Sequence, residues 1–154
     1  MRQFRGEAST IIDADPDAVF AMITDIDRLP TWNAAIEAVT DRPDALAVGI
    51  EWTVKMHPPR MPSWGSISRV VEMDRAERRF DYETRNADGN PSSVTWTWQV
   101  RPSGSGATEV TVTWVCELRT IDRRLLAGPL RRRHLAREVP RSLDALAGVF
   151  AATD

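Results

Sequence analysis

Three side chains place a titratable group where it can act on a bound molecule. Tyr82 lies in an alternating stretch, on the same side as Phe80, and its hydroxyl can orient a ligand oxygen or act as an acid. His134 and Glu138 are four residues apart, so on a helix they share one face and can form an acid–base pair. Each also has a structural explanation, either a hydrogen-bonded core tyrosine or a solvated helix face beside the arginines at 131–133. These three are the candidate catalytic residues.

Other kinds of chemistry find less support. His134 and Glu138 can supply two metal ligands but have no third, and His57 lies in a separate proline-rich loop, so no metal site is predicted. Cys116 follows apolar residues at alternate positions, which indicates a buried and unreactive thiol. The sequence has no phosphate-binding loop, dinucleotide fingerprint, nucleophile elbow or Cys-x-x-Cys pair. We therefore predict no cofactor.

Tryptophan is the most unusual feature of the composition, with six tryptophans against one tyrosine. Four of them fall on the apolar side of alternating runs, and Trp64 follows a proline-rich loop. Each can simply fill the core, but four indole N–H groups are hard to satisfy in a dry interior, so both a filled core and an aromatic pocket stay open. For an open pocket the predicted ligand-binding residues are Trp52, Val54, Met56, Trp64, Phe80, Tyr82, Trp96, Trp98, Trp114, Leu130 and His134.

The elements that must position these residues are mostly strands. Apolar residues alternate with polar ones in several runs, and turn residues such as Asp88-Gly89 separate the runs. This pattern predicts an antiparallel meander with one apolar and one solvated face. The predicted strands cover residues 4–12, 36–40, 50–56, 64–73, 78–85, 94–100 and 110–118.

Helices are predicted at two places. Asp15 is a good N-cap, and Pro16 suits the first position of a short helix. A second short helical segment follows, and Pro30 limits its length. Near the C-terminus the period changes to that of one helix face, with a lead-in at 122–127 before Gly128-Pro129 and a bend expected at Pro140. The residues that give this period are Leu135, Val139, Leu143, Leu146 and Phe150.

Length, charge and hydropathy limit the class of protein. The 154 residues suit a single domain covering 1–154, and a net charge of −2 gives no reason to expect a nucleic-acid partner. No window is apolar enough to cross a bilayer, so no integral membrane contact is expected. The first residues lack the apolar core of a signal peptide, and the single cysteine cannot form an internal disulfide. These observations predict a cytoplasmic protein.

The stretch 122–141 is basic, with seven arginines against two acidic residues. A basic helix can bind a partner protein or an anionic surface. It has no aromatic side chain to stack on bases or to anchor in lipid, which favours a solvated face.

The order of elements predicts an α+β fold in which a curved antiparallel sheet of about seven strands wraps around the long C-terminal helix, with two short helices after the first strand. Residues 12–20, Ile23-Thr24-Asp25 and Leu29-Pro30-Thr31-Trp32 resemble the opening of the START-like (SRPBCC) superfamily. Its members include polyketide cyclase/dehydrase-type proteins and birch-pollen-allergen-like lipid binders. Residues 96–102 and 108–112 also resemble its sixth and seventh strands. The resemblance implies a helix-grip fold with a hydrophobic cavity, but no shared catalytic set.

Three hypotheses about function remain open. The first is binding of a small hydrophobic or lipid-like molecule between the sheet and the C-terminal helix. The second is a cyclase or dehydratase that acts on a hydrophobic substrate in the same cavity, mainly by positioning it. The third is an interaction module that uses the basic helix.

Overall fold

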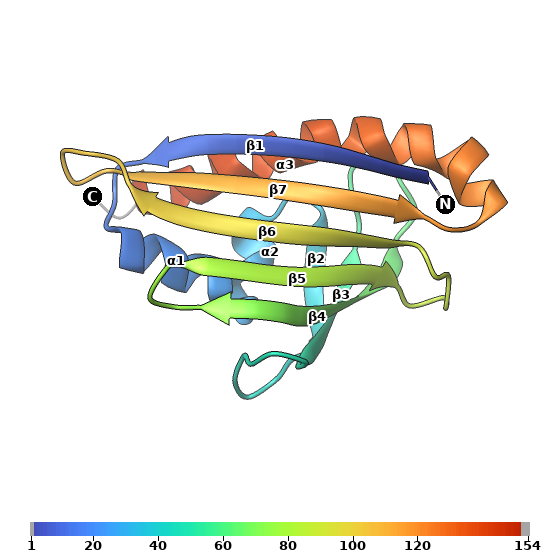
Figure 1. The fold of residues 1–154 in the computed structure, drawn as a ribbon, viewed down its shortest axis with the longest axis horizontal. Coiled ribbons are helices and arrows are strands. Elements are labelled where there is room, and N and C mark those ends of the chain that lie inside the picture. Colours follow the sequence, from blue (N-terminus) through green and yellow to red (C-terminus); the bar gives the residue numbers. More distant parts are fainter. Residues whose placement is uncertain (1, 152–154) are drawn as a thin grey trace.

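Seven strands form one antiparallel sheet in the computed structural model, which describes residues 2–151 (Figure 1). The order across the sheet is β1-β7-β6-β5-β4-β3-β2, so consecutive strands are neighbours except that β1 pairs with β7. The predicted meander is confirmed. The strands are β1 (Arg2–Ile12), β2 (Ile36–Asp41), β3 (Glu51–Met56), β4 (Trp64–Asp74), β5 (Arg79–Asn86), β6 (Ser93–Pro102) and β7 (Thr108–Leu118).

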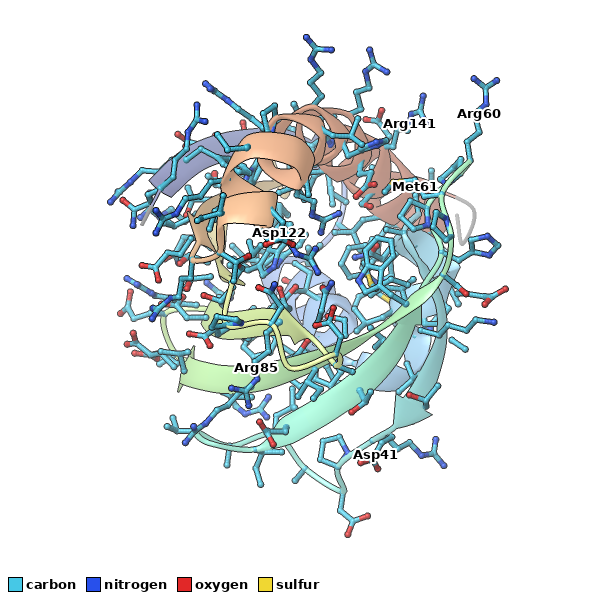
Figure 2. The ribbon with its side chains drawn as sticks, turned by 90° about the vertical axis from the view of Figure 1, so that its right-hand side faces the viewer. Asp41, Arg60, Met61, Arg85, Asp122 and Arg141 are labelled. Carbon is cyan, nitrogen blue, oxygen red and sulfur yellow. The ribbon has the colours of Figure 1, made fainter. Side chains whose placement is uncertain are left out.

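Irregularities in strand pairing accompany the curvature of the sheet. The register between β4 and β5 shifts between Val70 and Glu72, and the β2–β3 pair shifts twice. An extra residue on one strand bends that strand and increases its twist. The sheet therefore curves beneath the C-terminal helix, as the end-on view shows (Figure 2).

Three short helical segments join β1 to β2: α1 (Pro16–Thr24), η1 (Ile26–Arg28) and α2 (Leu29–Trp32). The Asp15 carboxylate accepts hydrogen bonds from the backbone N–H groups of Asp17, at 3.0 Å, and Ala18, at 3.3 Å. These bonds satisfy donors that the first helical turn leaves unpaired, which confirms the predicted N-cap. Packed against β6 and β7, α1 covers one end of the apolar face.

The predicted C-terminal helix is α3 (Gly128–Ala151), and its lead-in is a π-helical segment, η2 (Arg123–Ala127). A Cβ atom on Gly128 would overlap Leu118, so glycine lets the start of the helix lie against the end of β7. Pro140 lies inside α3, which continues through it. Leu135, Val139, Leu143 and Leu146 are all buried, as their spacing predicted.

The core between sheet and helices contains 23 buried apolar residues. Trp32 of α2 packs edge-on against Trp98 of β6, with ring centroids 5.5 Å apart. The end of the sheet near α1 and α2 is therefore filled with side chains. No helix within residues 2–151 combines the length and the apolar composition that crossing a bilayer requires.

Candidate functional site

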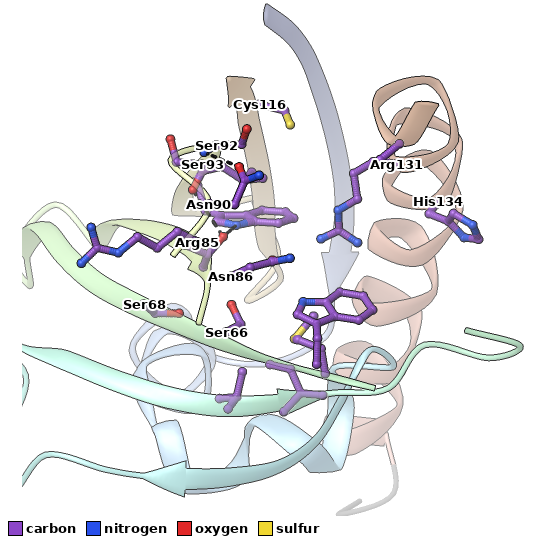
Figure 3. Close-up of a pocket in the computed structure, with 18 of the residues that line it drawn as sticks. Ser66, Ser68, Arg85, Asn86, Asn90, Ser92, Ser93, Cys116, Arg131 and His134 are labelled. Carbon is purple, nitrogen blue, oxygen red and sulfur yellow. Dashed lines mark hydrogen bonds between the residues drawn. The ribbon is translucent and has the colours of Figure 1, made fainter. Parts of the chain in front are cut away.

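A cavity of about 300 Å³ lies between the opposite end of the sheet and the first turns of α3 (Figure 3). Residues of six strands, β2 to β7, contribute to its walls, together with residues of α2, η2 and α3. The strand residues that form most of the wall are Trp52, Val54, Met56, Trp64, Ser66, Ser68, Tyr82, Thr84, Val94, Trp96, Cys116 and Leu118. From α3 come Leu130, Arg131 and His134.

Most of the predicted ligand-binding residues line this cavity. The eight that do are Trp52, Val54, Met56, Trp64, Tyr82, Trp96, Leu130 and His134. Phe80, Trp98 and Trp114 are outside its wall. Ligand contact by any of them stays a prediction.

The position of each tryptophan follows from its row across the sheet. Phe80 pairs with Trp98, and that row lies at the filled end, where Trp98 meets Trp32. Two residues further along, Trp96 pairs with Trp114, whose ring covers the backbone of Gly6 on β1. In the next row, from β3 to β7, every residue lines the cavity: Trp52, Ser68, Thr84, Val94 and Cys116. The period of two predicted the face correctly but could not distinguish the rows, because every second residue shares the face.

Tyr82 lies at the boundary between the filled core and the cavity. Its hydroxyl oxygen accepts a hydrogen bond from the Trp98 indole N–H at 3.3 Å. Burial raises the pKa of the Tyr82 hydroxyl to about 12. The hydroxyl is therefore neutral at physiological pH and keeps a proton that it can donate to a ligand oxygen.

We expect alkaline pH to weaken the fold through Tyr82. The unfolded chain loses this proton near the ordinary pKa of 10.0, whereas the folded protein keeps it until about 12, so the free energy of unfolding falls as the pH rises between these values. This difference between the two pKa values corresponds to a loss of roughly 2–3 kcal/mol in the free energy of unfolding. Urea denaturation of the wild type and of Tyr82→Phe, at about pH 9 and about pH 11.5, measures the difference. Parallel pH profiles for the two proteins would contradict the expectation.

The other candidate catalytic residues, His134 and Glu138, do not form a hydrogen bond or ion pair with each other. His134 lines the cavity, but Glu138 is buried outside its wall, and no hydrogen bond or ion pair connects these two described residues. Glu138 lies nearest to Arg131, with Oε2 at 3.8 Å from Nη1. Burial raises the pKa of the Glu138 carboxyl. Glu138 thus lies beside Arg131, and catalysis by His134 and Glu138 stays a prediction.

Cys116 is buried and reduced at the cavity wall. Burial raises the pKa of its thiol to about 11, so the thiolate, which is the nucleophilic form, is scarce near neutral pH. This agrees with the prediction of a buried, unreactive thiol.

Sequence reasoning missed Arg131. The run of three arginines at 131–133 indicates a solvated face, yet the Arg131 side chain extends from α3 into the space above the sheet (Figure 3). The guanidinium lies 5.7 Å from the centre of the Trp64 ring. One signal was present in the sequence: Arg131 is four residues before Leu135, which places it on the apolar face of the helix.

Solved structures with the same fold were found across almost the whole chain. An aromatase/cyclase from Streptomyces sp. R1128 has a TM-score of 0.78 at 17% identity, covering 97% of this chain and 94% of that one. A START superfamily protein from Mycobacterium smegmatis has a TM-score of 0.76 at 14% identity, covering 97% and 99%. The protein Ara h 8.0201 has a TM-score of 0.73 at 14% identity, covering 98% and 99%. These similarities show the helix-grip fold.

Among curated proteins, none matches the chain in sequence. The profile of one protein family, described as polyketide cyclase/dehydrase and lipid transport, matches residues 3–151. This match includes all the strands and helices described above except the first residue of β1, and it agrees with the resemblance carried by residues 12–32. The chain therefore belongs to the polyketide cyclase/dehydrase and lipid transport family.

Proposed function

We propose that this protein binds a small hydrophobic or lipid-like molecule in the cavity between the sheet and α3. The observation that carries the proposal is an apolar space of about 300 Å³ walled by Trp52, Trp64 and Trp96. Ligand sites are typically concave, mostly apolar and supplied with a few polar groups, and this cavity also has the Tyr82 hydroxyl and buried serines. The family to which the chain belongs agrees with this function. The proposal includes one domain over 1–154 and a cytoplasmic location.

Filling the cavity tests this proposal. Ser66 is buried in the wall on β4, and Ser66→Phe would direct an aromatic ring into the open space. We expect the affinity for the neutral fluorescent probe N-phenyl-1-naphthylamine to fall at least about tenfold, because the ring occupies the volume that the probe needs. Overpacking costs roughly 1–3 kcal/mol, so circular dichroism must first show that the variant is folded.

Ser9→Phe is the matched control. Ser9 is an exposed serine on β1, where the same ring would point into solvent. This variant should bind the probe as the wild type does. Equal probe affinity in Ser66→Phe and Ser9→Phe would place the probe elsewhere on the protein and refute binding in this cavity.

The second candidate function is a cyclase or dehydratase reaction in the same cavity. It is favoured by two groups on the wall that can exchange protons, the Tyr82 hydroxyl and the His134 imidazole. If a substrate is identified, turnover should fall in Tyr82→Phe and His134→Ala while probe binding persists. Unchanged turnover in both variants would remove this candidate.

A further inference from the structure

The charged side chains around the cavity are all of one kind. Arg85, Arg123 and Arg131 line it, whereas none of the described lining residues is an aspartate or a glutamate. Residues 122–141, which contribute the helical side of the cavity wall, are also the most basic stretch of the chain. Within low-dielectric walls, cations without an acid on the same surface create a positive potential that attracts anions.

Two of these arginines are paired away from the centre of the cavity. Arg85 meets Glu51 at 3.4 Å, and its side chain is 50% exposed. Arg123 meets Asp88 at 3.2 Å. Both pairs are screened by solvent and leave little charge to hold a ligand.

Arg131 differs because part of its guanidinium is buried without a hydrogen-bond partner in the described part of the chain. Only 24% of its side chain is accessible, and Nη1 is fully buried with no hydrogen-bond partner among the described residues. The nearest carboxylate oxygen, Oε2 of Glu138, is 3.8 Å away, which is beyond hydrogen-bond distance. Burial lowers the pKa of Arg131, an indication that the site does not fully compensate for the water that the guanidinium has lost.

The surroundings of Arg131 also fix its orientation. The guanidinium lies over the face of Trp64, a contact that stabilises a cation and limits its movement. Ser66 lines the cavity opposite Arg131, and its hydroxyl can form a hydrogen bond with a polar group of a ligand (Figure 3). About a quarter of the Arg131 side chain remains accessible and lines the cavity, so a ligand oxygen there can accept a charge-assisted hydrogen bond from the guanidinium.

We propose that the ligand of this cavity is an apolar acid, whose anionic oxygen, a carboxylate or phenolate, accepts a hydrogen bond from Arg131 while its apolar body lies between Trp52 and Trp96. This inference rests on the proposed function, since it names the chemical class of the molecule bound in the same cavity. It assigns Arg131 to selection between acids and their neutral analogues.

Displacement of N-phenyl-1-naphthylamine by two matched compounds tests the proposal. 2-Naphthoic acid and 2-naphthamide have nearly the same shape, but only the acid carries a charge at neutral pH. We expect the acid to bind the wild type about tenfold or more tightly than the amide, because a hydrogen bond between charged groups is stronger than one with a neutral acceptor. Decanoic acid and decanamide repeat the comparison with a lipid-like body.

Arg131→Met and Arg133→Met identify the residue responsible. Arg131→Met should remove the preference for the acid, since the acid loses a hydrogen bond between charged groups and the amide loses only a weaker one. Methionine retains an apolar side chain of similar length. Arg133 is exposed on the same helix, so Arg133→Met should keep the preference. If Arg131→Met does not fold, the comparison of acid with amide on the wild type still decides the proposal.

Two results would overturn the inference while leaving the proposed function intact. One is equal displacement of the probe by acid and amide in both compound pairs. The other is a preference for the acid that persists in Arg131→Met. Absence of any binding, by the probe or by all four compounds, would instead reject the proposed function and this inference with it.

Discussion

Trp98→Ala is expected to lower the free energy of unfolding by about 3–5 kcal/mol. Trp98 is 3% exposed, and its ring packs edge-on against Trp32. Truncation leaves a void in the filled end of the core and removes the donor to the Tyr82 hydroxyl. Because a domain of this size is typically stable by only about 5–15 kcal/mol, part of the variant should be unfolded near physiological temperature. Guanidinium denaturation followed by circular dichroism measures the change.

Two further substitutions separate packing from the hydrogen bond. Trp98→Phe keeps a ring but cannot donate to Tyr82, and we expect it to cost much less, about 1–2 kcal/mol. Trp64→Ala removes a half-buried ring from the cavity wall and should cost least, because existing space already adjoins it. A loss below about 1 kcal/mol in Trp98→Ala would mean that its ring is not packed in the core as described.

Gly6→Ala is expected to have the second largest effect, a loss of about 2–3 kcal/mol from a single added methyl group. Gly6 on β1 pairs directly with Trp114 on β7, and a Cβ atom at this position would overlap the indole ring. Either the ring or the edge strand must move. Glycine usually weakens a strand, so its presence here is explained by the close approach of the ring.

A double variant tests this explanation of the effect. In Gly6→Ala/Trp114→Ala the overlap is gone, so the loss should be smaller than the sum of the two single losses by about 1 kcal/mol or more. Ser9→Ala, on the exposed side of the same strand, is the control and should change stability by less than about 0.5 kcal/mol. Additive losses in the double variant would show that the ring does not constrain Gly6.

Much of the fold follows from local signals in the sequence. The sequence placed all seven strands to within about two residues, the first from its composition and most of the others from alternation. Alternation is informative because the side chains of a strand point to opposite faces and only one face here is buried. The N-cap at Asp15 and the apolar spacing from Leu135 to Phe150 located the helices for equally local reasons. The helix-grip arrangement then follows, since the apolar face of the meander needs a long helix to cover it.

The cavity depends on contacts between distant parts of the chain. Phe80, Tyr82 and Thr84 share one face and one strand, yet only the last two border open space, because α1 and α2 fill the end of the sheet that Phe80 occupies. In the same way, Trp96 borders the cavity and Trp98 does not. No local pattern carries this information, since it depends on where helices from elsewhere in the sequence lie.

Arg131 shows the same division between sequence and tertiary structure. The sequence determined that a basic helix follows the sheet and that Arg131 shares a face with Leu135. Only the tertiary structure decided that this arginine, unlike the exposed Arg132 and Arg133, is enclosed beside Trp64 with Glu138 just beyond hydrogen-bond distance. The physical reason is that helical periodicity fixes the direction of a side chain, whereas its solvation depends on the walls that the sheet builds around it.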